Sequence, residues 1–189
     1  MRKFTIATIF ILLYSTTAFT ATFGVSGLLH FPYALSTQKS DDGGNNILTW
    51  HPGVSFNAIL PFFGNHIISP EMGYVYYRDN KDDYSKSSIF LLCDLGYRFS
   101  ANTLLRYGVG TFITSISGDG AAIVLNNGSG TATFYRPTDT TKSYTSTFNL
   151  GIESIYTPQL AWRLETFIAN IFSSERRKLS YTLQIIKYF

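Results

Sequence analysis

Apolar and polar residues alternate with period two along most of the chain beyond residue 22. In Phe148–Glu153, Phe, Leu and Ile alternate with Asn, Gly and Glu, and Ile89–Ser100 repeats the pattern with Asp94 and Arg98 on its polar side. Neighbouring side chains of a strand point to opposite faces, so this period predicts strands with one apolar and one polar face. No segment in this part of the chain has the ~20 apolar residues that a membrane helix needs.

The alternation predicts eight strands. They cover residues 23–35, 47–60, 66–77, 88–100, 103–116, 143–156, 161–173 and 178–189. Each is long enough for the roughly 9–11 tilted residues of a membrane strand. An even strand number is the rule in bacterial single-chain barrels, and it places both ends of the barrel on one side. We therefore expect an all-β fold, a closed antiparallel transmembrane β-barrel.

The predicted connections alternate in length. The short ones are 61–65, 100–102 and 157–159, and the others, 36–46, 78–87, 117–142 and 174–177, are mostly longer and more polar. Short turns on one side and long loops on the other are typical of outer-membrane barrels. Within the longest loop, Ala121–Leu125 and Thr131–Arg136 flank an Asn-Asn-Gly-Ser-Gly turn, which favours a hairpin. We expect this hairpin above the membrane, because Ala121–Leu125 is too short to span it.

The N-terminus has the three parts of a secretory signal peptide. Arg2 and Lys3 precede the apolar run Phe4–Tyr14, and small residues follow. We expect a helical signal peptide over residues 1–21 and a barrel over residues 22–189, with cleavage after Ala18 or Ala21. An uncleaved N-terminal anchor is the alternative interpretation.

Composition narrows the class of protein further. Charged residues make up 14% of the chain and aromatic residues 16%, whereas soluble domains carry about 25% charged residues. The net charge is +3 and the bases are scattered, which argues against a nucleic-acid groove. Cys93 is the lone cysteine and cannot form an internal disulfide.

Alternation by itself is also compatible with a soluble, lipocalin-like barrel whose apolar face points inward. The positions of aromatic residues favour the membrane arrangement, because rings gather near both ends of the predicted strands, as at lipid–water interfaces. One group lies towards the long loops and the other towards the short turns: Phe31, Tyr33, Trp50, Tyr74, Tyr76, Tyr144 and Phe172; and Phe56, Tyr97, Phe99, Tyr156, Trp162 and Phe189.

The last strand ends the chain with apolar residues at alternate positions. Tyr181, Leu183 and Ile185 lead to the terminal Phe189, with Lys187 departing from the pattern. This strand resembles the C-terminal signature of outer-membrane barrels, and the whole layout resembles the small eight-stranded barrels of the OmpA/OmpX type. The resemblance implies that Tyr181, Leu183, Ile185 and Phe189 form an assembly signal read by the barrel-assembly machinery. It also implies location in the outer membrane of a Gram-negative bacterium.

The polar faces predict the contents of the lumen, since the interior of an eight-stranded barrel is filled by side chains. Buried charges have to pair, so we expect a polar network there. Its charged members are Glu71, Asp94, Arg98, Arg106, Glu153, Arg163 and Glu165. The network either fills the lumen and fixes strand register or, as a sharper hypothesis, acts as a gate that opens when ion pairs change partners.

Three functions remain open at this stage. The first is a non-enzymatic envelope protein with a structural or surface-contact role, and the second is a narrow channel for ions or small solutes. The third is a lipid A-modifying enzyme, for which His30 and His51 lie near Ser40, Asp41 and Asp42. We expect no enzyme activity, cofactor, metal or nucleic acid. The expected partners are outer-membrane lipids and lipopolysaccharide, the latter through 175–178, around a monomeric barrel.

Overall fold

The computed structural model describes residues 21–36, 49–78, 84–126, 130–171 and 177–189. The described residues form ten strands. They are β1 (Thr22–Ser36), β2 (His51–Phe63), β3 (His66–Tyr76), β4 (Tyr84–Ser100), β5 (Thr103–Gly118), β6 (Ala122–Asn126), β7 (Thr131–Tyr135), β8 (Thr141–Thr157), β9 (Leu160–Ala169) and β10 (Lys178–Tyr188). No helix in this part of the chain is long and apolar enough to cross a bilayer.

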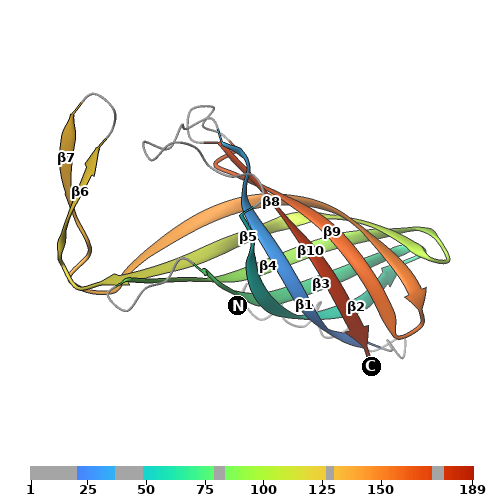
Figure 1. The fold of residues 1–189 in the computed structure, drawn as a ribbon. Helices are drawn as coiled ribbons and strands as arrows, with labels where there is room; N and C mark the ends of the chain where they lie inside the picture. The colour runs from blue at the N-terminus through green and yellow to red at the C-terminus, as the bar shows by residue number, and fades with distance from the viewer. Residues whose placement is uncertain (1–20, 37–48, 79–83, 127–129, 172–176) are drawn as a thin grey trace, which may run out of the picture.

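Eight of these strands close into an antiparallel barrel in the order β1-β10-β9-β8-β5-β4-β3-β2 (Figure 1). The seam pairs the two ends of the barrel, with Gly24 of β1 opposite Tyr188 of β10. β5 pairs directly with β8, and β6 and β7 form a separate two-stranded sheet that projects beyond the barrel. The predicted fold class and the predicted hairpin are therefore confirmed. The predicted signal peptide lies outside the described residues.

Strand ends differ from the prediction in physically understandable ways. β2 runs to Phe63 instead of ending before Pro61, because Gly64 adopts a φ of 56° and closes a two-residue turn. A register shift between Pro61 and Phe63 accommodates the proline near the strand end. β9 ends at Ala169, where Asn170 takes a positive φ of 54°.

The outside of the barrel is apolar and the inside is largely polar. Along β4, for example, Leu91, Cys93 and Leu95 face outward and are exposed, whereas Leu92 and Asp94 are buried. Leu150 and Ile152 of β8 are likewise exposed, at 49% and 42%. A barrel surrounded by water would have the opposite polarity, so this arrangement matches lipid outside and a packed interior.

Candidate functional site: a charged network inside the barrel

The candidate site is a network of polar side chains buried in the middle of the barrel. Six of the seven predicted charged residues belong to it, and all six are between 0% and 4% exposed. They are Glu71, Asp94, Arg106, Glu153, Arg163 and Glu165. They come from β3, β4, β5, β8 and β9, and each occupies the inward phase of its strand. Strand alternation therefore brings residues up to 94 positions apart into one cluster.

Arg163 joins three strands through its guanidinium group. Its Nη1 binds Glu71 on β3, across the lumen from β9. Its Nε donates to Glu153 Oε2 on β8 at 2.9 Å, and its Nη2 lies 2.9 Å from the same oxygen. The planar guanidinium presents several donors at fixed angles, so one arginine can hold two carboxylates in place.

Arg106 is the second base of the network. Its Nη2 donates to Asp94 Oδ2 at 2.7 Å and to Ser69 Oγ at 3.0 Å. Its Nη1 donates to Glu153 Oε2 at 3.4 Å, so both arginines share Glu153. The sharing of Glu153 makes the two guanidinium groups part of one connected ion-pair cluster.

Neutral residues connect this cluster across the seam of the barrel. Ser55 of β2 donates to Glu71 Oε1 at 2.7 Å and contacts Ser26 of β1 at 2.6 Å. Ser26 in turn donates to Gln184 of β10 at 3.1 Å. Asn149 of β8 donates through Nδ2 to Asp94 Oδ1 at 2.7 Å and to Glu165 Oε1 at 2.6 Å. Every strand of the barrel thus contributes at least one side chain.

Tyr188 is a member of the network that the sequence analysis did not name. Its hydroxyl donates to Glu153 Oε1 at 2.6 Å, and its side chain is 4% exposed. The signal was available in the sequence, because Thr182 and Gln184 alternate with the outward-facing Tyr181, Leu183 and Ile185 and therefore share the inward phase of the last strand. Extending that phase by four residues reaches Tyr188.

Arg98 is a predicted member of the network that lies outside it in the structure. It was expected in the network, but its side chain is exposed, and among the described residues it makes no ion pair with the buried acids. Arg98 lies two residues beyond buried Gly96, where β4 approaches the short-turn end of the barrel. There it lines a pocket of about 300 Å³ together with Tyr156 and Tyr188.

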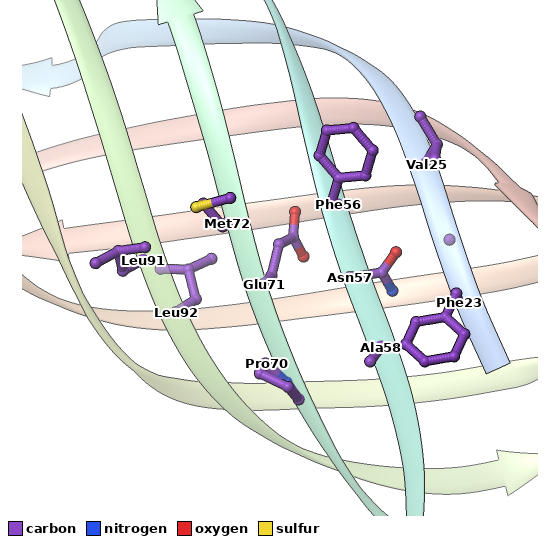
Figure 2. A pocket seen from close by; sticks show the side chains of 11 residues that line it. Phe23, Val25, Phe56, Asn57, Ala58, Pro70, Glu71, Met72, Leu91 and Leu92 are labelled. Carbon is purple, nitrogen blue, oxygen red and sulfur yellow. The ribbon is translucent and has the colours of Figure 1, made fainter. Parts of the chain in front are cut away.

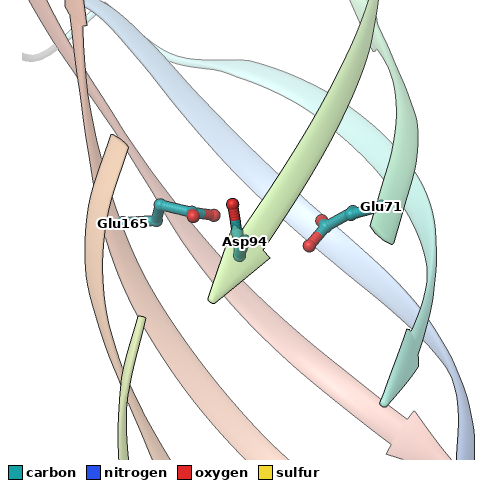
Figure 3. A group of neighbouring side chains, drawn as sticks. All are labelled: Glu71, Asp94 and Glu165. Carbon is teal, nitrogen blue, oxygen red and sulfur yellow. The ribbon is translucent and has the colours of Figure 1, made fainter. Parts of the chain in front are cut away.

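Three acids of the network converge closely enough to suggest a metal site. The carboxylates of Glu71, Asp94 and Glu165 each place an oxygen within 4.8 Å of the others (Figure 3). Donors already engage these carboxylates: Arg163 holds Glu71, and Arg106 and Asn149 hold Asp94. A cation here would have to displace guanidinium groups, so the arrangement fits an ion-pair cluster better than a metal centre.

Two apolar layers enclose the network along the barrel axis. Towards the long-loop end lie the buried residues Leu28, Val75, Tyr77, Phe90, Leu92, Phe112 and Phe167. Towards the short-turn end lie Ile59, Ile67, Leu104, Ala161, Ile186 and Tyr188. The rings of Phe112 and Phe167 meet edge to face at 5.3 Å, and Phe90 and Phe167 are fully buried. The charged network is thus packed between two apolar layers.

His30 and His51, the histidines considered for catalysis, pack against the apolar layer at the long-loop end, with the Tyr77 ring centre 4.4 Å from that of His51 and 6.4 Å from that of His30. His30 and His51 face each other across β1 and β2, and both are buried, at 3% and 1% exposure. His51 Nδ1 accepts a hydrogen bond from the backbone N–H of Arg78 at 3.0 Å. His66 lies at a short turn, with its Nδ1 3.2 Å from the carbonyl of Phe63. Ser40, Asp41 and Asp42 lie outside the described residues.

Comparison with known proteins identifies the architecture. No protein-family model matches the sequence, and no curated protein is significantly similar to it. Among solved structures, the Yersinia pestis outer membrane protein Ail in a phospholipid nanodisc aligns with a TM-score of 0.50 at 7% identity, over 89% of this chain and 99% of that chain. The chain has the fold of an outer-membrane β-barrel.

Two further outer-membrane barrels align over similar lengths. The N-terminal barrel of Pseudomonas aeruginosa OprF gives a TM-score of 0.47 at 11% identity, over 89% of this chain and 97% of that one. Neisserial surface protein A gives 0.46 at 8% identity, over 91% and 96%. Sequence identities this low carry no information on function, so the function of this outer-membrane barrel has to be argued from its own residues.

The C-terminal strand of the outer-membrane barrel has the predicted orientation. Leu183, Ile185 and Phe189 are exposed on the outer face, and Tyr181 stacks on Phe31 of β1 with 4.4 Å between ring centres. The backbone N–H of Phe189 donates to the carbonyl of Phe23 at 2.9 Å. The Lys187 ammonium lies 6.0 Å from the Phe189 ring centre. The role of these residues in assembly remains a prediction.

Proposed function

We propose that this outer-membrane barrel is a non-enzymatic envelope protein, which supports membrane integrity and makes surface contacts through its long-loop end. The observation that carries the proposal is the packing of the lumen. Paired charges fill its middle, and apolar layers enclose them on both sides. Such an interior supports the proposal of a rigid wall with a closed lumen.

The long-loop end supplies a surface that supports the contact role. There β4, β5 and β8 are 16 or 17 residues long, whereas β9 has only 10, so the three-stranded part extends beyond its neighbour. The β6–β7 hairpin continues from it (Figure 1). Val124, Tyr135 and Tyr144 are 62–76% exposed in this part of the molecule. Exposed aromatic residues on a rigid base are the side chains that most often anchor partners.

Planar-bilayer recording tests the closed lumen. We expect no conductance from the wild-type barrel, and none from Glu153→Ala, although that change removes the acid shared by both arginines. The apolar layers remain in the variant, so they continue to exclude ions. The lipid-facing Leu150→Ala is the matched control. Conductance that appears only in Glu153→Ala would favour the gated channel instead.

A lipid A-modifying enzyme is the alternative from another class. The partners of Ser88, a serine in the lumen near the long-loop end, support a non-enzymatic role, because they are hydroxyl groups. Its Oγ lies 2.7 Å from the hydroxyl of Thr114 and 3.4 Å from that of Tyr77. A nucleophilic serine needs a histidine base within hydrogen-bond reach. Mass spectra of lipid A from cells with and without the barrel provide the test. A new lipid A species that depends on His30 would contradict our proposal.

The proposed partners follow from the same membrane placement. We propose that the barrel is a monomer in outer-membrane lipids, that the assembly machinery inserts it, and that Arg177 and Lys178 contact lipopolysaccharide phosphates. Both residues are exposed at the long-loop start of β10, and arginine and lysine are the usual phosphate ligands. Loss of lipopolysaccharide binding in Arg177→Gln/Lys178→Gln would support this contact.

A further inference from the structure

A groove of about 440 Å³ opens on the outer wall of the barrel over β1 to β4 (Figure 2). This volume lies in the range of roughly 300–1,000 Å³ that is common for small-molecule sites. One side of the groove is a row of cross-strand neighbours on the outer face, namely Val25, Phe56, Met72 and Leu91. Phe23, Ala58 and Pro70 line it beside this row.

The sequence explains why the wall is hollow at this place. Ala58 and Pro70 are small, and they lie between the bulky Phe23, Phe56 and Met72. Pairing of β2 with β3 reaches Asn57↔Glu71 and resumes at Leu60↔Ile68, so it skips Ser69 and Pro70 on β3. Proline has no N–H to donate to the ladder, which accounts for the interruption.

The chemistry of the groove points to an apolar occupant. All of its outward-facing side chains are apolar, and Phe23, Phe56 and Met72 are 61%, 57% and 53% exposed. Asn57 and Glu71 form part of the floor but are 5% and 4% exposed. Glu71 is already engaged by Ser55 and Arg163 on the lumen side. The floor therefore offers little to a polar headgroup.

We propose that this groove is a binding site for one acyl chain of a membrane lipid, which resides there longer than lipids elsewhere on the barrel. The inference rests on the proposed placement of the barrel in a bilayer. Hydrocarbon gains nothing by leaving other hydrocarbon, so selective residence has to come from close packing. The hollow between Phe23, Phe56 and Met72 supplies that packing, because a chain there contacts side chains on more than one side.

Photocrosslinking in a bilayer tests the site. The full barrel is placed in nanodiscs that contain a phospholipid with a diazirine in its acyl chain, and adducts are mapped after illumination. We expect adducts at Phe23, Phe56, Met72 and Leu91 to exceed, several-fold, those at Leu150 and Leu164 on the other wall. Adducts spread evenly around the barrel would overturn the site and leave the membrane placement intact. No adducts at any residue would overturn both.

A matched pair of substitutions sharpens the test. Ala58→Phe fills the groove, whereas Thr166→Phe adds the same ring to the outer face of β9. We expect groove adducts to fall several-fold in Ala58→Phe and to stay unchanged in Thr166→Phe. Heat-modifiable mobility checks that each variant is folded, and Ala58→Leu replaces Ala58→Phe if the larger residue does not fold. Unchanged groove adducts in the folded filling variant, or crosslinks to a second copy in place of lipid, would overturn the proposal.

Discussion

At the scale of residues, the lumen shows how buried charges become tolerable in a narrow barrel. Each arginine binds carboxylates from at least two other strands, and Asn149 places its amide between Asp94 and Glu165. The cluster nevertheless contains four acids and two bases, because Arg98 lies outside it. Two acids are therefore in excess, and removing an acid and removing a base should have different consequences.

Substitution of one base and one acid makes this difference measurable. Arg163→Met should lower the free energy of unfolding by about 3–5 kcal/mol, because it leaves buried carboxylates without their partner. Glu165→Gln should change it by less than about 1 kcal/mol, because glutamine keeps an acceptor for Asn149 and the excess of acids falls. Urea unfolding in lipid vesicles provides the measurement. An equal loss in both variants would show that the excess of acids has no influence.

At the scale of elements, β10 combines two faces with separate tasks. Its outward phase leads to Phe189, the residue after the strand, which corresponds to the predicted assembly signal, and its inward phase ends in Tyr188, which binds Glu153. The strand also closes the barrel by pairing with β1 on one side and β9 on the other. The last two residues of the chain should therefore affect different steps.

Tyr188→Phe and deletion of Phe189 separate those steps. We expect Tyr188→Phe to insert normally but to lose about 1–3 kcal/mol of stability, because a buried carboxylate oxygen loses its donor. Deletion of Phe189 should instead reduce the amount of barrel inserted in cells. Membrane fractionation gives the inserted amount, and urea unfolding of purified barrel gives the stability. Normal insertion of the truncated chain would show that Phe189 is not an essential signal.

At the scale of the whole molecule, the barrel and its projecting hairpin are separate units. The barrel has a closed ladder of eight strands, and β6 and β7 pair only with each other. The base of the hairpin is narrow, because the Gly120 N–H donates to the Pro137 carbonyl at 3.1 Å. Gly120 and Pro137 can therefore be joined directly without moving β5 or β8.

Deletion of residues 121–136 tests this independence. We expect both the full chain and the deletion variant to fractionate with the outer membrane and to shift in mobility on SDS gels only after boiling. The reason is that closure of the barrel involves none of the deleted residues. A soluble, unshifted full-length product would contradict the membrane barrel, whereas failure of the deletion variant alone would show that the hairpin supports the fold.

The sequence by itself determined the strands, their number and the face that each side chain occupies. Period-two alternation is a local property, and it placed Glu71, Asp94 and Arg163 on inward phases without knowledge of their neighbours. The Asn-Gly turn likewise predicted the hairpin. These features depend on residues close in the chain, so a pattern read along the sequence is sufficient for them.

Only the tertiary structure decided which of these residues meet. Arg98 lies on the inward phase of its strand but is exposed at the short-turn end of the barrel, whereas Tyr188 lies close enough to Glu153 to bind it. The reason is that the height of a side chain along the barrel axis depends on strand register around the closed barrel. Ala58 and Pro70 are unremarkable in sequence, and only their proximity across β2 and β3 creates the groove. Register and closure bring together residues that are far apart in the chain. Local alternation contains no information on which of those residues become neighbours in space.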